Sequence, residues 1–172
     1  MSFVSCKTSK SSIITSKEKA KEKGIYSYNE KKSKDSKFKS KKIVSKTKSD
    51  IVSSAKENIG VKYKSGGKTK DGMDCSGLVY STFLKYEIEL SRSSVDMAKE
   101  GREVSNSKAQ EGDLIFFKTG GSTTINHVGI ITENNNGDIL FIHSSTSKGV
   151  IISSLSESYY AKAFDKIKRV IE

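Results

Sequence analysis

The chain has 172 residues, of which 34% are hydrophobic and 30% are charged, a length and composition that suit one ordinary domain and a tail. No run reaches the roughly 18 apolar residues of a membrane-spanning helix, and two cysteines are too few for a disulfide framework. The formal net charge of +11 is concentrated at the front, because residues 7–50 hold 15 lysines and five acidic residues whereas residues 51–172 hold 16 basic and 15 acidic residues. The domain itself is therefore nearly neutral, which argues against a nucleic-acid-binding face.

Residues 1–47 are predicted to be a basic, disordered tail that is rich in Ser, Lys and Thr. Such a segment has too few apolar side chains to offset the entropy of ordering it, and its like charges should extend it. A solvated tether is the plain interpretation, and binding to an anionic lipid or wall polymer is an additional one. The ordered domain is predicted to cover residues 48–172.

Three helical patterns open the predicted domain. Apolar residues at helical spacing predict a first helix over 49–60, starting at Ser49 or Asp50. A glycine-bearing loop follows, and the apolar spacing after Cys75 predicts a second helix. Residues 93–101 carry an N-cap pattern and predict a third, short helix.

Four β-rich runs, separated by Gly and Asn, occupy the second half of the chain. They are residues 113–118, 127–133, 138–145 and 149–155. Residues 161–172 are ambiguous, with a strand favoured at their end. Because helices come first and strands follow, the pattern predicts an α+β domain built on an antiparallel sheet.

Cys75 is a candidate nucleophile because it lies at a predicted helix N-terminus. The free N–H groups and the positive end of the helix dipole favour an anion there, and a neighbouring imidazolium would favour it further. Such a site can lower a thiol pKa from about 8.5 to between roughly 3.5 and 7.5. A thiolate is a strong nucleophile, and a histidine is its natural proton partner at neutral pH. Taken alone, the same cysteine is equally compatible with a small buried hydrophobe.

The two histidines of the chain, His127 and His143, both lie on predicted strands. In an antiparallel hairpin, a three-residue loop over 134–136 would place them opposite each other on one face. A two-residue turn at Asn136 and Gly137 would place them on opposite faces. A single site that uses both histidines therefore requires an odd-length loop or a bulge. Taken singly, a strand histidine is more often structural than catalytic.

A zinc site is the other interpretation of one cysteine and two histidines, because that set can hold a catalytic zinc. The spacings C-x-x-C and H-E-x-x-H are absent, and no carboxylate is evidently placed as a base. We therefore expect neither a metal nor another cofactor, and a thiol with a histidine base remains the favoured chemistry.

Several ordered motifs together resemble the NlpC-type cell-wall cysteine endopeptidases, which belong to the papain-like superfamily. They are VKYKSGGKTKDGMDCSGLVYSTF, ELSRSSVDMAKEGREV, EGDLIFFKTGG, INHVGIIT and FIHSSTSKGVIISSL. The resemblance spans about residues 49–172. Within the family, the chain most resembles the small lipoprotein murein endopeptidases. It implies a papain-like α+β fold, with N-terminal helices packed on a central antiparallel sheet.

The resemblance also implies a reaction and its residues. Cys75 corresponds to the family's nucleophile, His127 to its base and His143 to the polar residue that orients the base. The implied reaction is hydrolysis of peptide bonds in the stem peptides or cross-links of bacterial peptidoglycan, which makes peptidoglycan the expected partner. The same chain is expected to be a monomer in the cell envelope.

Three more positions match the family's motifs around the nucleophile. Tyr63 corresponds to the tyrosine that lines the site near the oxyanion, and Asp74 and Ser76 correspond to positions associated with the substrate. The family's usual proline before the tyrosine is replaced by Lys62.

Cys6 ends the segment FVSC, which is similar to the end of a bacterial lipoprotein signal. The apolar core of such a signal, about 7–15 residues, is missing. Either the true start lies upstream and Cys6 anchors the chain to a membrane through a lipid, or Cys6 is an ordinary tail cysteine. Two alternatives to the peptidase also stay open: a papain-like amidase or acyltransferase, and a lipid-anchored wall-binding module without turnover.

Overall fold

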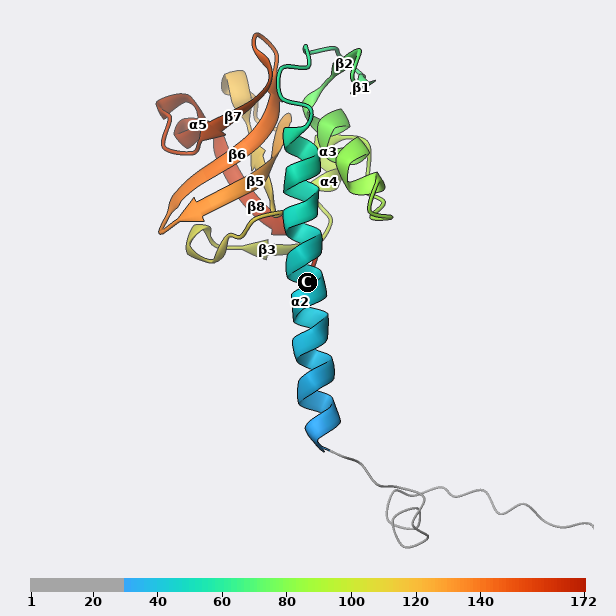
Figure 1. Ribbon diagram of the computed structural model, residues 1–172. Coiled ribbons are helices and arrows are strands. Elements are labelled where there is room, and N and C mark those ends of the chain that lie inside the picture. The colour runs from blue at the N-terminus through green and yellow to red at the C-terminus, as the bar shows by residue number, and fades with distance from the viewer. Residues whose placement is uncertain (1–29) are drawn as a thin grey trace, which may run out of the picture. The chain divides into compact units, whose positions relative to one another are not determined.

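The computed structural model describes residues 30–172, with side chains from Lys42 onward (Figure 1). The first 29 residues of the predicted tail, Cys6 among them, lie outside the described residues. Residues 40–172 form one compact unit. In chain order the elements are α2 (Glu30–Lys56), β1 (Lys68–Thr69), β2 (Gly72–Met73), α3 (Cys75–Leu84), α4 (Ser94–Met97), β3 (Arg102–Val104), the 3₁₀-helix η1 (Asn106–Lys108), β4 (Leu114–Phe117), the 3₁₀-helix η2 (Thr119–Gly121), β5 (His127–Asn135), β6 (Asp138–Ser145), β7 (Gly149–Ser154), α5 (Ser158–Ala163) and β8 (Phe164–Arg169).

The centre of the unit is a six-stranded sheet in the order β3-β8-β4-β5-β6-β7, in which all neighbouring strands pair antiparallel. The predicted α+β class with an antiparallel sheet is confirmed. The four predicted β-rich runs are β4 to β7, and the ambiguous end of the chain divides into α5 and β8. Because β8 inserts between β3 and β4, the last strand of the chain lies inside the sheet (Figure 1).

Apolar side chains cover both faces of this sheet. One core packs α2, α3 and α4 against one face, and its fully buried members include Ile51, Leu78, Phe83, Met97, Leu114, Phe116 and Ile130. The other core packs α5 against the opposite face and includes Ile115, Phe117, Ile131, Ile139, Phe141 and Ile167. All four residues of β4 are 0% exposed, as expected for a central strand that is covered on both sides.

The hairpin of β5 and β6 turns at Asn136 and Gly137, which both have positive φ (54° and 106°). The turn therefore has two residues, and the three-residue loop considered from the sequence is wrong. The pairing register shifts between Ile131 and Glu133, where β5 carries a bulge. One extra residue in a strand reverses the faces of the side chains beyond it, so the bulge returns both histidines to one face. The bulge that a shared site requires is thus confirmed.

The first described helix begins earlier than the sequence predicted. α2 starts at Glu30, so Ser49 and Asp50 lie inside it and neither caps it. Residues 30–59 contain neither Gly nor Pro and are rich in Lys, a good helix former. Lys46 also pairs with Asp50 four residues on, at 3.0 Å, in a geometry that supports a helix.

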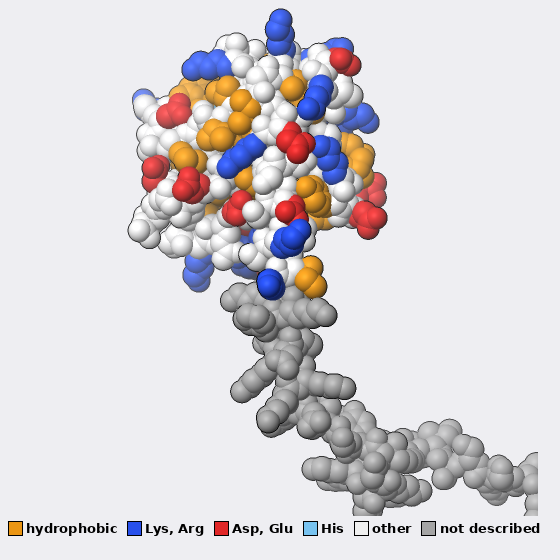
Figure 2. Space-filling view, in the orientation of Figure 1, with side chains coloured by type: hydrophobic (Ala, Val, Ile, Leu, Met, Phe, Trp, Pro, Cys, Tyr) orange, Lys and Arg blue, Asp and Glu red, His pale blue; other side chains and the backbone are white. Residues whose placement is uncertain are grey.

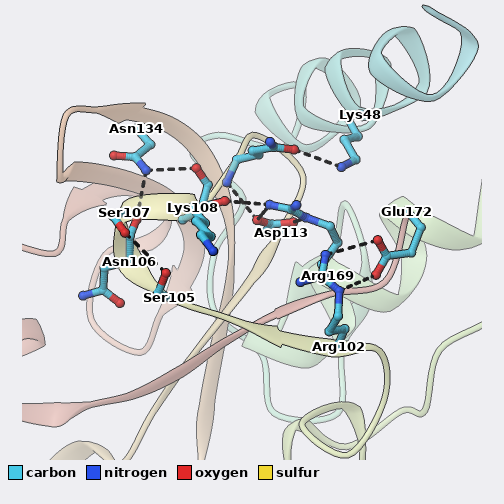
Figure 3. Close-up of polar contacts among 12 residues, drawn as sticks. Lys48, Arg102, Ser105, Asn106, Ser107, Lys108, Asp113, Asn134, Arg169 and Glu172 are labelled. Atoms are coloured by element: carbon cyan, nitrogen blue, oxygen red, sulfur yellow. Dashed lines mark hydrogen bonds and ion pairs between the residues drawn. The ribbon is translucent and has the colours of Figure 1, made fainter. Parts of the chain in front are cut away.

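A polar network holds the domain end of α2 against the sheet (Figure 3). Lys48 is 8% exposed, its stem lies over the Gly112 turn, and its Nζ donates to Gln110 at 3.4 Å. Nearby, Arg169 on β8 makes two bonds of 2.8 Å to the carboxylate of the buried Asp113. Because the backbone N–H of Gln110 also donates to Asp113, these contacts connect α2 to β8, elements from opposite ends of the domain.

The charges of the described surface are mixed in sign. Figure 2 shows Lys and Arg side chains interspersed with Asp and Glu on the visible face of the unit. This pattern agrees with the nearly balanced composition of residues 51–172. Among the described helices, none is both long and apolar enough to cross a membrane.

Candidate active site

The start of α3 presents Cys75 as the first residue of a well-capped helix. Asp74 is the N-cap, and its Oδ1 accepts from the backbone N–H of Gly77 at 2.6 Å. A Cβ at Gly77 would overlap the carbonyl oxygen of Gly67, so glycine is required for the loop to approach this helix turn. The order Asp-Cys-Ser-Gly thus has a local physical reason: it caps the helix, begins it with the thiol and lets the preceding loop pack against it.

Arg92 completes this corner and was not singled out from the sequence. Its guanidinium donates to both carboxylate oxygens of Asp74, at 3.0 and 2.9 Å, and to the hydroxyl of Ser76 at 2.7 Å. Burial alone would raise the pKa of the Asp74 carboxyl, but bonds from Arg92 and from the N–H groups of Gly77 and Gly66 hold that pKa below its usual value. Asp74 is therefore an ionised, fully bonded anchor beside the thiol.

The thiol of Cys75 lies against the backbone that leads into β5. Its Sγ is 3.9 Å from the carbonyl oxygen of Asn126, the residue before His127. Burial raises the pKa of this thiol, and the nearby charge of Asp74 raises it further, whereas the N–H groups of Val128, Ser76 and Cys75 itself lower it. The lowered thiol pKa predicted from the helix N-terminus is wrong in direction, because burial outweighs the N–H groups.

His127 and His143 bond directly to each other. The Nε2 of His127 and the Nδ1 of His143 are 2.9 Å apart, and the two rings meet edge to face. They are diagonal neighbours across the β5–β6 pair, with Gly129 beside His143, where a Cβ would overlap the backbone and Phe141. Because Nε2 of His127 faces His143, the Nδ1 of His127 is the nitrogen left for another partner.

An aromatic shell surrounds the histidine pair on the α5 face of the sheet. The ring centroids of Phe141 and Tyr160 lie 5.0 and 5.2 Å from that of His143, and Phe117 lies 6.1 Å from His127. Burial lowers the pKa of His127 to about 4, and burial together with the His127 charge lowers that of His143 to about 3. Both imidazoles are thus neutral near pH 7, and a neutral imidazole can accept a proton.

The remaining predicted positions lie around the same thiol. The backbone of Tyr63 pairs with Met73, the residue before the α3 cap, in an isolated β-bridge. Burial and the neighbouring Cys75 raise the pKa of the Tyr63 hydroxyl. The polar atoms of Asp74 and Ser76 are engaged by Arg92, so their expected contact with a substrate remains a prediction. Among the described side chains, from Lys42 onward, no three of His, Cys, Asp or Glu converge as metal ligands.

Sequence reasoning missed the supports that come from distant parts of the chain. Arg92 lies in the quoted motif ELSRSSVDMAKEGREV, but its pairing with Asp74 has no local signal. Ser153 on β7 and Tyr160 on α5 both reach His143, at 3.2 Å each. Ser144 on β6 donates to the carbonyl of Met73 at 2.7 Å and so ties the histidine strand to the segment that precedes Cys75.

Comparison with known proteins places this chain in a family. The NlpC/P60 family profile matches residues 60–169. The chain is 43% identical over 125 residues to the murein DD-endopeptidase MepS/murein LD-carboxypeptidase of Escherichia coli K12, an alignment that covers 72% of this chain and 63% of that protein. It is 41% identical over 112 residues to the probable endopeptidase NlpC of the same organism, covering 64% of this chain and 70% of that protein. The chain thus spans less than two thirds of the length of MepS.

Solved structures agree with the sequence relatives. A crystal structure from Staphylococcus aureus, described as similar to a lipoprotein of the NLP/P60 family, superposes with a TM-score of 0.64 at 32% identity. The alignment covers 74% of this chain and 42% of that chain. The helices and the six-stranded sheet described above therefore follow the architecture of that family.

Proposed function

Because this chain belongs to the NlpC/P60 family, we propose that it is a cysteine endopeptidase that hydrolyses peptide bonds in the stem peptides or cross-links of peptidoglycan. In this proposal Cys75 is the nucleophile, His127 is the base and His143 orients His127. The steps below need no metal and no cofactor.

One observation carries the proposal. The Nε2 of His127 is hydrogen-bonded to Nδ1 of His143, at 2.9 Å. The Cys75 thiol lies against the backbone on either side of His127, near the carbonyl of Asn126 and the N–H of Val128. This leaves Nδ1 of the His127 ring as the acceptor for the thiol proton. The sequence of thiol, imidazole and second polar group is the arrangement that activates a cysteine nucleophile.

In the first half of the reaction the Cys75 sulfur attacks the carbonyl carbon of the scissile bond, and its proton passes to His127. The tetrahedral intermediate collapses when the His127 imidazolium returns that proton to the leaving amine, which leaves a thioester on Cys75. Because burial lowers the pKa of His127 to about 4, the ring is neutral before attack and is a strong proton donor once it is charged.

The negative oxygen of the intermediate needs donors at the start of α3. The backbone N–H of Cys75 is one candidate, and the hydroxyl of Tyr63 is a second. Loss of one such donor typically removes about 2.7–4 kcal/mol of transition-state stabilisation. In the second half, water attacks the thioester with His127 again as base, and the acid product leaves as the thiol regains its proton.

The test is digestion of purified peptidoglycan by the full chain and by matched cysteine variants. Cys75→Ala and Cys75→Ser should abolish release of soluble fragments, because both remove the thiol, whereas Cys6→Ala should digest the wall at the wild-type rate. Near-wild-type digestion by either Cys75 variant would contradict the mechanism. Alkylation of Cys75 in the Cys6→Ala variant distinguishes an enzyme from a wall-binding module. Loss of lysis with retained wall binding supports an enzyme, whereas loss of both lysis and binding would favour neither of the two.

Mass spectrometry of the released muropeptides identifies the bond in the same experiment. The Escherichia coli relative is named both a DD-endopeptidase and an LD-carboxypeptidase. Conversion of cross-linked dimers to monomers indicates cleavage of the D,D cross-link, and shortened stems indicate cleavage within a stem, including at the γ-D-glutamyl bond. Release of stems from the glycan would instead indicate the papain-like amidase alternative.

We further propose that the chain acts in the cell envelope and that Cys6 is a lipid-anchored cysteine at the end of a basic tether. The support is the lipoprotein-like segment FVSC and the net charge of residues 7–50. The cysteine variants above also test this point. Protein expressed from an upstream start should partition with membranes, and Cys6→Ala should abolish that partition without changing digestion in solution.

A further inference from the structure

The far side of the His143 ring faces two hydroxyl groups that the proposed steps do not use. Its Nε2 is 3.2 Å from Oγ of Ser153 on β7 and 3.2 Å from the hydroxyl oxygen of Tyr160 on α5. His143 is 0% exposed, Ser153 6% and Tyr160 9%, so no bulk water competes for these bonds.

The proposed reaction imposes one tautomer on this chain of bonds. His127 can take the thiol proton at Nδ1 only if its own hydrogen is on Nε2, the nitrogen that faces His143. The Nδ1 of His143 must then be bare and accept that hydrogen bond. A neutral imidazole carries one hydrogen on its ring nitrogens, so the hydrogen of His143 must be on Nε2. Among the described residues, Ser153 and Tyr160 are the acceptors within hydrogen-bond distance of that nitrogen.

We propose that Tyr160 and Ser153 are positioning residues that accept the Nε2–H of His143 and so hold both histidines in the tautomers that proton transfer from Cys75 requires. This inference rests on the peptidase function proposed above. Neither side chain touches the reacting atoms, and both act through His143.

The surroundings of Tyr160 suit this role. Its ring packs edge to face on Phe141, with centroids 5.0 Å apart, and lies 5.5 Å from Phe117, so the hydroxyl is held in one place. The titratable groups around His143 are His127 and Tyr160, with Tyr159 and Glu157 beyond Tyr160. Burial raises the pKa of the Tyr160 hydroxyl, which therefore stays protonated and neutral over the working range of a histidine.

Two hydroxyls at one nitrogen explain how the arrangement tolerates the proton's movement. When His127 becomes an imidazolium, its hydrogen bond draws electron density from the His143 ring, which then carries part of the positive charge. The hydroxyl oxygens of Ser153 and Tyr160 lie next to that ring as acceptors. In a buried site these oxygens replace the water that would otherwise solvate the charge. Either hydroxyl alone supplies one acceptor, so we expect partial redundancy.

The experiment compares Tyr160→Phe, Ser153→Ala and the double variant in the full chain, with Tyr159→Phe as the control. The side chain of Tyr159, the neighbouring residue on α5, is 57% exposed. The control therefore makes the same chemical change on the same helix without touching His143. We expect the double variant to lower kcat by about tenfold or more with little change in KM, because proton transfer and not binding is impaired. Each single variant should lose less, and Ser153→Thr, which keeps a hydroxyl, should retain activity.

A second measurement reads the tautomers without turnover. In the Cys75→Ala background, long-range ¹H–¹⁵N correlations should report His143 with its hydrogen on Nε2, and the Tyr160→Phe, Ser153→Ala changes together should shift it toward Nδ1. An unchanged tautomer and wild-type kcat in the double variant would overturn the inference. Failure of the proposed function gives a different pattern, in which the wild-type chain does not digest peptidoglycan although the tautomer shift is present.

Discussion

The start of α3 and the histidine pair hold their polar groups by opposite means. Asp74 keeps its charge at a partly exposed corner, where Arg92 and two backbone N–H groups bond to it. His127 and His143 lie in an aromatic shell, bond to each other and to neutral hydroxyls, and have pKa values of about 4 and about 3. The thiol of Cys75 thus lies between the Asp74–Arg92 corner, which stabilises a charge, and the aromatic shell around the histidines, which disfavours one.

This difference bears on how Cys75 would be activated as the proposed nucleophile. A resting thiolate–imidazolium pair would place a positive charge in the buried pocket, where burial has already lowered the histidine pKa, and a negative one on a thiol whose pKa burial raises. The environment therefore favours a neutral thiol and a neutral imidazole before the substrate arrives. In the proposed mechanism, proton transfer then accompanies attack by Cys75, and the bonds of Asp74 hold the start of α3 in position.

The largest effect should come from titrating the buried pocket. The unfolded chain protonates its histidines near pH 6.5, whereas the folded chain keeps His127 neutral down to about pH 4. Between these values the unfolded state binds more protons, so acid lowers the free energy of unfolding. For His127 alone the loss is on the order of 3 kcal/mol by pH 4. Urea unfolding at several pH values measures it.

The control for this titration uses the fact that the chain has only two histidines. Because His143 is also neutral down to about pH 3, His127→Gln should lower the slope between pH 6.5 and 4 by about half and leave the His143 share. Equally steep wild-type and variant curves would contradict the assigned share of His127. The charged corner titrates in a different window. Because the pKa of Asp74 is held below its ordinary 3.8, its contribution is present above that pH and is lost only as pH falls further.

A smaller loss should follow from breaking the charged corner. Asp74→Ala removes the cap of α3 and leaves Arg92 without its carboxylate, which we expect to lower the free energy of unfolding by about 2 kcal/mol. Asp71→Ala is the matched control, since Asp71 is exposed and bonds only to Thr69 among the described residues. Chemical denaturation at pH 7 compares them, and equal stability of the two variants would show that the corner does not hold α3.

The smallest effect should be a gain in stability two turns into the same helix. Thr82 is 1% exposed, and its Oγ1 has no hydrogen-bond partner among the described residues, in contrast to the fully bonded Asp74. Thr82→Val replaces the buried hydroxyl with a methyl group of similar size. It should raise the free energy of unfolding by about 1 kcal/mol without changing digestion. Thr82→Ser keeps the hydroxyl and loses the methyl, and a Val variant no more stable than Ser would contradict this account.

The elements that local pattern specifies were predicted well from the sequence. The α3 start follows from a capping residue and apolar spacing, and β4 to β7 follow from β-rich runs bounded by Gly and Asn. The α2 boundary failed because a lysine-rich helix has no apolar period, and Lys48 gains its place only from contacts with Gln110 and Gly112. The short strand β3 also escaped prediction, since three residues hold too little pattern.

The sequence by itself determined the candidate chemistry: a cysteine at a capped helix start and two histidines on adjacent strands, with a shared site that required a bulge. Only the tertiary structure decided where the bulge lies, that burial raises the thiol pKa, and that Arg92, Ser153 and Tyr160 support the site. The physical reason is range. Caps and periodicity act within a few residues, whereas desolvation and side-chain hydrogen bonds depend on segments far apart in the chain that folding brings together.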